Sequence, residues 1–565
     1  MRRWLWLMAL APALRAQSPE EVRAAVSKAL PVLERSTGNF VAKRTCVSCH
    51  HNILSILTFR MARDLGFPID PAILSAAEEK TFRGLRKPEA LDEAIQATTL
   101  NDPTPDESYL LMAANWAGIE PNLTTAVYAR RLANWQREGH WVTSDFRPPH
   151  SSSIFTATAT AVYAIRVYMP DELAAERDAC IARARDWLAK TRPASTEDAA
   201  FRLLGLVWAN AQEEQIAAAK RDLVVMRKPS GGWPQLPPYE ADAYSTGEAL
   251  FALHESGVPA NDAAFRVGLK FLLSTQAGDG TWRIRTRMLS PAEVSPKYFT
   301  TGFPYGHDEY LSYAGSCWAV MALLEAAPRR FLDRRLRPPQ RDWKWAALFG
   351  KADDIDPNGI TDGGTTVLMM AAPDAEKVKR LLARGAKADP RAVTIAAAYR
   401  GTAASIQLLL DAGAGIPPKA LVLASMSGDL DNVKLLLARG AEPSAVALSQ
   451  AVTFGCPEIV RTLIAAGAPA KITEKTGINL LHWAAIANRA SVIPVLAATG
   501  TPVNATDQNG YTPLMYAATI DFGDTETLKA LLKAGADPFI RNHDGRTARE
   551  QARHFHHAAI EAALR

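Results

Sequence analysis

A short helix-end signature recurs through the C-terminal part of the chain. Each copy is an apolar run that is followed within three residues by glycine. The copies are LLARGA (381–386), LLLDAGA (408–414), LLLARGA (435–441), LIAAGA (463–468), LAATGT (496–501) and LLKAGA (531–536). Their glycines are spaced by 28, 27, 27, 33 and 35 residues. A helical unit of this length cannot bury its apolar face alone, so the pattern predicts a solenoid of stacked neighbours over 341–565.

The last repeats add a turn-and-helix motif to this period. Residues 512–518 are TPLMYAA, close to T-P-L-H-x-A, and Gly477 and Gly510 precede two first helices 33 residues apart. Residues 341–565 therefore resemble ankyrin repeats, which implies a protein partner bound through fingers and inner helices. We expect the three short repeats to have lost residues from the hairpin finger. Binding is expected to centre on the finger tips at 474–479 and 507–511, where Asp507 bonds the backbone of the turn and Tyr511 lies at the tip. The alternative is an array that packs on the preceding domain as a structural cap.

The pentad Cys46-Val47-Ser48-Cys49-His50 carries the clearest chemical signal. Two thioether bonds to a haem need two thiols about one helical turn apart, and the iron needs an imidazole beneath the same ring. Two alternatives stay open at this point. A thioredoxin-like dithiol normally follows a strand, and no strand pattern precedes Cys46. A zinc site needs two further ligands, of which His51 is one candidate.

The pentad resembles the attachment site of c-type cytochromes, through those five residues only. The resemblance implies one covalent haem c, with Cys46 and Cys49 on the vinyl carbons and His50 as an axial ligand of the iron. It leaves the sixth ligand unassigned. The possible ligands are Met112, His140 and His150. We expect Met61 to share a helix with His50 and point away, and His51 to face away from the iron.

Residues 101–335 hold eight of the thirteen tryptophans. Gln276–Trp282 fits Q-x-x-x-G-x-W, and weaker copies end at Trp233 and Trp141. Residues 243–253 and 316–324 are apolar helices rich in small residues, which predict closely packed inner helices. Residues 55–335 resemble the squalene cyclase and prenyltransferase superfamily. That resemblance implies an α/α toroid of two concentric helix rings around an apolar cavity, which could hold an apolar small molecule.

The catalytic motifs of that superfamily are not matched. A D-x-D-D acid is missing, because the nearest sequence around Asp242 lacks the paired acids. Residues 353–356 are DDID and fall beyond the toroid, where a repeat loop is expected. His307, Asp308 and Cys317 do not have the spacing of the prenyltransferase zinc ligands. The toroid is therefore expected to be a scaffold or binding element, with a divergent enzyme site as the alternative.

The first sixteen residues predict a cleaved secretory signal peptide. Arg2 and Arg3 precede an apolar run to Leu14, and Ala16 suits a cleavage point. The mature chain is then expected to be exported, to a bacterial periplasm or beyond. No later stretch is apolar enough to predict a membrane span. The net charge of +5 does not predict a nucleic-acid partner.

Two smaller segments have competing interpretations. Residues 329–341 are basic and contain two prolines, which favours a linker over a basic binding patch. His554, His556 and His557 suggest a metal site, but a solvated terminal helix is the simpler interpretation.

These observations together predict an all-α protein with three parts in succession along the chain. A helical segment with the haem site (17–100) leads into the toroid (55–335), and the ankyrin solenoid (341–565) follows. The function we expect is periplasmic electron transfer or haem-based sensing, with the ankyrin array docking a protein. An enzyme acting on a lipid-like or terpenoid-like substrate in the toroid, and a non-catalytic interaction scaffold without haem, are the alternatives.

Overall fold

The computed structural model describes residues 18–96, 102–150, 152–288, 300–326 and 341–565. The predicted signal peptide (1–16) and nearly all of the predicted linker (329–341) lie outside these ranges. The described chain is mostly helical, as predicted. Two short strands, β1 (Trp233–Pro234) and β2 (Ala241–Asp242), pair antiparallel with Trp233 opposite Asp242. Among the described helices, none combines the length and hydrophobicity that a membrane crossing requires.

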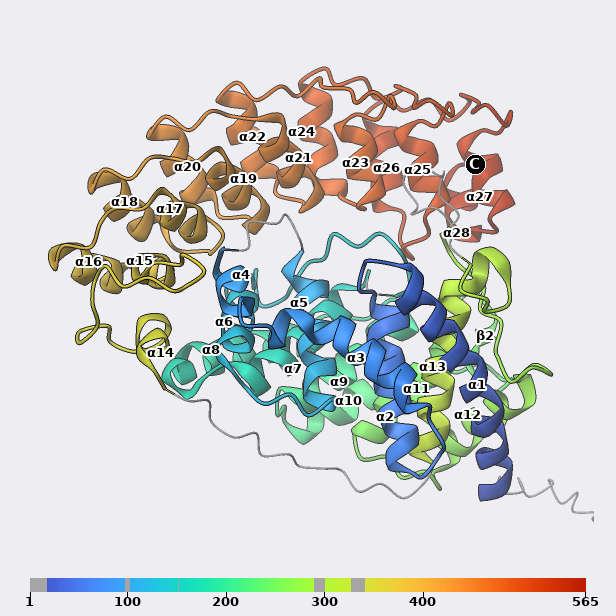
Figure 1. The fold of residues 1–565 in the computed structure, drawn as a ribbon. Coiled ribbons are helices and arrows are strands. Elements are labelled where there is room, and N and C mark those ends of the chain that lie inside the picture. The colour runs from blue at the N-terminus through green and yellow to red at the C-terminus, as the bar shows by residue number, and fades with distance from the viewer. Residues whose placement is uncertain (1–17, 97–101, 151, 289–299, 327–340) are drawn as a thin grey trace, which may run out of the picture.

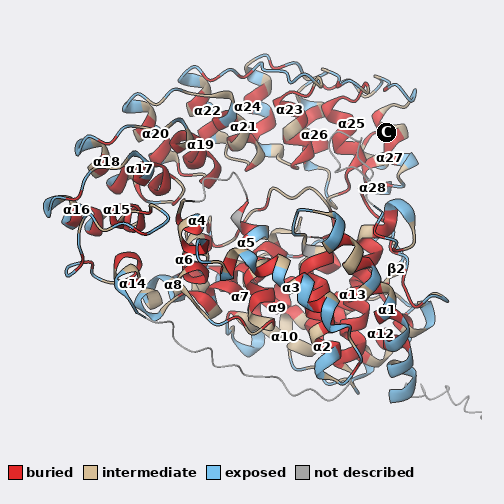
Figure 2. Cartoon of the chain, viewed as in Figure 1, coloured by how far each residue is buried: buried red, intermediate tan, exposed pale blue. Residues whose placement is uncertain are grey.

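Within the described residues before 327, one set of helices closes into a ring. Its members contact one another in cyclic order, and the last returns to the first. They are α2 (Ser55–Asp64), α5 (Pro103–Trp116), α7 (Ile154–Tyr168), α9 (Thr196–Trp208), α11 (Ala243–Glu255) and α13 (Glu309–Glu325). The inner helices are mainly buried in Figure 2, which marks them as the core of this half.

A second set of helices packs around the outside of the ring, and each one contacts at least one inner helix. These are α1 (Pro19–Lys43), α3 (Pro71–Arg86), α6 (Leu123–Asn134), α8 (Ala174–Lys190), α10 (Glu213–Val225) and α12 (Ala263–Thr275). Shorter elements complete this half: η1 (Cys49–Leu54, a π-helix), α4 (Ala90–Gln96), η2 (Asp171–Leu173) and η3 (Gly306–Asp308). Local capping explains where several of them start. The Ser18 hydroxyl accepts from the Glu21 backbone N–H, for instance, at the beginning of α1.

The three tryptophan motifs fold into the same local structure. Trp141, Trp233 and Trp282 are all buried, and each indole Nε1–H donates to a carbonyl near the end of the preceding outer helix. The backbone N–H of each tryptophan also donates to a Ser or Thr hydroxyl on the next inner helix. Each motif therefore ties one outer helix to the inner helix that follows it.

The glutamine of the motif extends the same connection to a further helix. Gln276 donates through Nε2 to the Gly280 carbonyl inside its own turn, and to the Ala25 carbonyl of α1, both at 2.9 Å. Gly280 itself has a φ of +93°, and a Cβ there would lie 2.5 Å from the Lys28 carbonyl oxygen. Glycine at this position permits both the turn and the close approach of α1.

The C-terminal half is an arch of paired helices (Figure 1). Its elements are α14 (Trp343–Leu348), α15 (Val367–Ala371), α16 (Ala375–Ala383), α17 (Pro390–Ala397), α18 (Ala403–Asp411), α19 (Pro418–Ser427), α20 (Leu430–Ala438), α21 (Ala445–Thr453), α22 (Pro457–Ala465), α23 (Leu480–Ile486), η4 (Ala490–Val492), α24 (Ile493–Ala498), α25 (Pro513–Thr519), α26 (Glu526–Lys533), α27 (Ala548–His554) and α28 (Ala558–Ala563). Glycines at the repeated signature have positive φ, as the helix ends require.

The lengths of the loops between repeats vary as the spacing predicts. In the middle of the arch only residues 384–389, 412–417 and 439–444 join one repeat to the next. Later the joining segments are 466–479, 499–512 and 534–547. The short repeats thus lack most of the finger, while the residues DDID at 353–356 fall in the loop between α14 and α15, as expected.

The arch rests on the ring mainly through the turns between the two helices of a repeat. At the start of the arch, the loop before α15 also contacts α4, where Gln96 Nε2 donates to the Gly363 carbonyl at 2.9 Å. Arg137 of the ring donates to the carbonyls of Met426 at 2.8 Å and Phe454 at 3.0 Å. Arg287 of the ring donates to the Asp521 carbonyl at 2.8 Å. In the opposite direction, Arg489 of the array donates to the Thr143 carbonyl of the ring. The long finger loops run along the outer rim of the arch, away from the ring (Figure 1).

Candidate functional site

The pentad lies between α1 and α2, at the edge of the ring. The chain leaves α1 in extended conformation at Arg44, and the Cys46 thiol is exposed. Cys49 begins the π-helix η1, although its side chain lies outside the described residues. The Ser48 hydroxyl caps this turn by accepting from the His51 backbone N–H at 3.1 Å. Single π-helical turns often occur at functional sites, because they redirect side chains from the regular helical spacing.

His50 is partly buried in a cluster of aromatic rings. Its ring centroid lies 5.9 Å from Phe40, 6.0 Å from Tyr310 and 6.4 Å from His150. Burial holds the pKa of His50 well below its ordinary value, and the neighbouring imidazoles of His51 and His150 lower it further. The ring is therefore neutral at pH 7, which is the form that binds a metal ion.

The His51 imidazole lies directly against the imidazole of His50. The two Nδ1 atoms lie 2.5 Å apart. The His51 ring is stacked between Phe40 and Tyr313, at centroid distances of 4.9 and 3.8 Å, and its Nε2 lies 3.0 Å from the Ser36 hydroxyl. Burial lowers the pKa of His51 to about 3. Packing of the two rings across α1 and α13 decides this orientation, and it makes His51 a partner that holds His50.

Behind His150, a buried hydrogen-bond network extends into the interior of the ring. His150 precedes α7, and its Nδ1 lies 3.1 Å from the hydroxyl of Tyr244 on α11. The Tyr244 hydroxyl donates to a carboxylate oxygen of Glu197 at 3.3 Å, and Thr156 donates to the other oxygen at 2.7 Å. His150, Tyr244 and Glu197 are each at most 3% exposed.

Glu248, on the same helix as Tyr244, is a second buried acid beside this network. Burial raises the pKa of both carboxyl groups, most strongly that of Glu248, where the nearby charge of Glu197 adds to the shift. Sequence reasoning missed Tyr244, Glu197 and Glu248. A glutamate in the middle of the apolar segment 243–253 was the available signal, because a charged residue is seldom buried unless it has a partner.

The other residues considered as ligands are placed elsewhere. Met61 lies on α2 and Met112 on α5, and both side chains are buried in the apolar core. The ring of His140 stacks on Trp187 at a centroid distance of 4.8 Å. Of the three possible sixth ligands, His150 is the one whose ring contacts that of His50.

The acids considered for catalysis serve structural roles. Asp242 caps α11 by accepting from the Ser245 backbone N–H at 2.9 Å, and burial raises its pKa to about 6. Asp308 forms an ion pair with Arg283 at 3.1 Å. Cys317 is buried in α13, whereas His307 is exposed, and the described residues form no metal-ligand cluster from these side chains.

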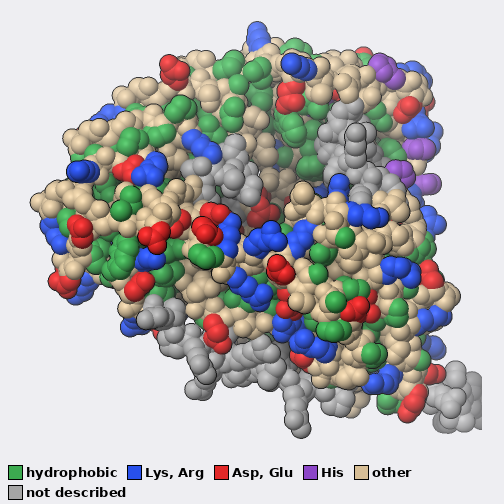
Figure 3. Space-filling model, in the orientation of Figure 1, with side chains coloured by type: hydrophobic (Ala, Val, Ile, Leu, Met, Phe, Trp, Pro, Cys, Tyr) green, Lys and Arg blue, Asp and Glu red, His purple; other side chains and the backbone are tan. Residues whose placement is uncertain are grey.

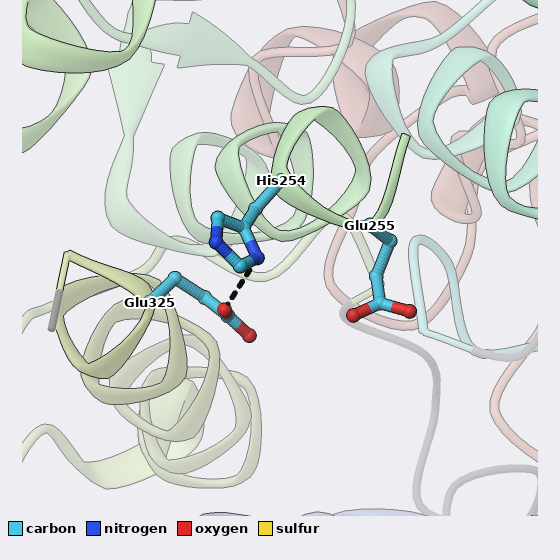
Figure 4. A group of neighbouring side chains, drawn as sticks. All are labelled: His254, Glu255 and Glu325. Carbon is cyan, nitrogen blue, oxygen red and sulfur yellow. Dashed lines mark ion pairs between the residues drawn. The ribbon is translucent and has the colours of Figure 1, made fainter. Parts of the chain in front are cut away.

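The terminal histidines also separate from one another. His557 is buried, and its Nδ1 lies 3.0 Å from the Ala518 carbonyl, while His554 and His556 are exposed. Among the described residues, the three side chains that do approach as metal ligands could are His254, Glu255 and Glu325, with ligand atoms within 4.8 Å of one another (Figure 4). His254 Nδ1 and the buried Glu325 carboxylate lie 2.6 Å apart, so an ion pair between α11 and α13 accounts for their approach.

The comparison with protein families concerns the arch. Residues 448–548 match the family model of ankyrin repeats in three copies. The prediction of ankyrin repeats is therefore confirmed, and such repeats suggest a protein partner. A search of curated proteins found no match to the chain.

One residue predicted to lie at the tip of an ankyrin finger is not at the surface. Tyr511 is 8% exposed, and its hydroxyl accepts from Gln551 Nε2 at 2.5 Å. A substitution there would disturb the array itself, because the Tyr511 side chain packs between two repeats. Asp507 holds the finger turn as expected, since its Oδ1 accepts from the backbone N–H groups of Asn509 and Tyr511 at 2.9 and 2.7 Å.

Proposed function

We propose that this chain is an exported haem c protein, used in electron transfer or haem-based sensing, whose ankyrin array docks a protein. The observation that carries the proposal is the position of His50. It directly follows the two cysteines of the pentad, and its neutral ring faces a second neutral imidazole, that of His150.

The donor set fits a covalent haem. Cys46 and Cys49 would hold the porphyrin edge, with the Cys46 thiol exposed to the maturation machinery, and His50 would bind the iron. A bound haem would supply one-electron chemistry at its iron. The aromatic rings of Phe40 and Tyr310 would exclude water from that side, and His51 would hold the His50 imidazole in place through Nδ1.

We further propose that the helix ring is an α/α toroid that serves as a scaffold. Two observations support this interpretation: the cyclic order of the inner helices, and the three tryptophan motifs that each tie an outer helix to the next inner helix. A ligand held inside the ring beside Glu248 would have to bond this buried acid, because a buried polar group costs free energy when left without a partner. A purely apolar lipid does not meet that requirement.

The proposed partner surface is the finger rim of the array. The turns between paired helices already contact the helix ring, through Arg137 of the ring and Arg489 of the array among others. The array thus both covers one end of the ring and keeps its long fingers clear of it. On the face drawn in Figure 3, acidic and basic side chains are interspersed, and the surface is hollowed between arch and ring.

Haem staining tests this proposal. The full-length chain is expressed in a bacterial periplasm with a cytochrome c maturation system, and a known c-type cytochrome serves as control. We expect wild type to keep haem through denaturing electrophoresis, Cys49→Ser to keep at most one thioether, and His50→Ala to lose most assembled product. The matched control is Cys456→Ser, a cysteine of the array, which should mature normally. Wild type without stain, while the control cytochrome matures, refutes the haem function.

A further inference from the structure

We propose that His150 is the second axial ligand of the iron when haem is attached to Cys46 and Cys49 and bound by His50. This inference rests on the proposed haem function. It assigns the position that the pentad leaves open, and it predicts a six-coordinate, bis-imidazole centre.

The separation of the two imidazoles supports the assignment. A metal ion bound by imidazole nitrogen lies about 2 Å from that nitrogen. Two imidazoles on opposite sides of one ion therefore have ring centroids roughly 6 Å apart. The His50 and His150 centroids are 6.4 Å apart, although the residues are separated by the whole segment from η1 to the start of α7. The fold therefore brings the two rings to the distance that a shared metal ion requires.

Both rings are held in the same way by the protein. His50 Nδ1 contacts His51 at 2.5 Å, and His150 Nδ1 contacts the Tyr244 hydroxyl at 3.1 Å. Metal-bound histidines commonly engage their second nitrogen with a protein partner, which fixes the ring and tunes its basicity. In this arrangement Nε2 is the nitrogen that each ring would present to the iron.

The Tyr244 hydroxyl also sets the tautomer of His150. Because Tyr244 donates its proton to Glu197, its oxygen accepts from His150, so Nδ1 of that ring carries the hydrogen. The lone pair of the neutral imidazole is then on Nε2. Thr156 donates to the other Glu197 oxygen, which holds the carboxylate in place. Tyr244 and Glu197 are thus positioning residues that act on the iron through His150.

The experiment compares ferric spectra of the matured full-length protein. We expect wild type to be low-spin by absorption and electron paramagnetic resonance. His150→Ala should retain its covalent haem stain but become largely high-spin, and added imidazole should restore the low-spin spectrum. His140→Ala is the matched control, since that ring stacks on Trp187, and it should remain low-spin. Tyr244→Phe should stay low-spin with a raised reduction potential, because the ligand becomes less basic.

The possible failures separate the two proposals. A low-spin His150→Ala protein with attached haem overturns the ligand assignment and leaves the haem function standing. If that variant does not fold, the near-infrared charge-transfer band of ferric wild type decides, because methionine and imidazole ligation give different bands. A high-spin or methionine-ligated wild type overturns the assignment. Absence of covalent haem from wild type overturns the proposed function, and the ligand assignment with it.

Discussion

The contact between α11 and α13 can be tested at one atom. Gly247 lies in the middle of α11, and a Cβ built there would be 2.5 Å from the Trp318 carbonyl carbon and 2.7 Å from its oxygen. Ordinary contacts of a Cβ begin at 3.4 Å. The neighbouring atoms belong to the backbone of α13, so no side chain can rotate away. Gly247→Ala must therefore push two inner helices of the ring apart by about 1 Å.

The expected loss follows from two opposing contributions. Overpacking of a tight interior costs about 1–3 kcal/mol. Replacing glycine by alanine within a helix returns up to about 1 kcal/mol. We therefore expect Gly247→Ala to lower the free energy of unfolding by about 1–2 kcal/mol. The matched control is Gly84→Ala in α3, where a Cβ would meet nothing within 4 Å. That variant should gain about 0.5–1 kcal/mol.

Hydrogen exchange of the full-length protein is the suitable assay, since a chain with two large parts need not unfold in one step. Peptides from α11 and α13 should exchange faster than in wild type in Gly247→Ala, and at the wild-type rate in Gly84→Ala. Urea denaturation should shift the midpoint of unfolding in opposite directions for the two variants. Gly247→Ala as stable as wild type, with unchanged exchange in α11 and α13, would refute the close helix contact.

Three further predictions concern other parts of the molecule. Trp282→Ala should lower the free energy of unfolding by about 3–5 kcal/mol, because it removes a buried indole and its hydrogen bond to the Leu272 carbonyl. Thermal denaturation measures this loss, and a loss below about 1 kcal/mol would contradict the prediction. His482 is buried and its pKa is lowered to about 4, so the stability that this neutral ring contributes is present above pH 6.5 and is lost as pH falls toward 4. The loss should reach about 3 kcal/mol, and His482→Gln should flatten the dependence of α23 exchange on pH after correction for intrinsic rates. Arg137→Ala should expose the turns at 426–429 and 454–456 to faster exchange and leave the distant α27 unchanged; equal protection would show that this arginine does not hold the arch.

The arch was predictable because its signals are local. A positive-φ glycine after each second helix and a repeated spacing of apolar residues report on backbone geometry within one repeat. The short fingers followed from the same spacing. Tyr511 was misplaced at a finger tip for a related reason. Its burial depends on Gln551 of the next repeat, and a motif within one repeat does not report on that contact.

The pentad and the tryptophan motifs were also visible in the sequence, since each is a few residues long and makes most of its bonds nearby. What lies opposite His50 was not. Closure of the helix ring brings His150, Tyr244 and Glu197 together from separate segments of the chain, and no periodicity links their positions. The orientation of His51 likewise depends on Phe40 and Tyr313, on two different helices. The sequence by itself determined the helices, the repeats and the candidate attachment residues, because those depend on short-range hydrogen bonding and side-chain spacing. Only the tertiary structure decided which rings and carboxyl groups share one buried site, because that depends on contacts between residues far apart in the chain.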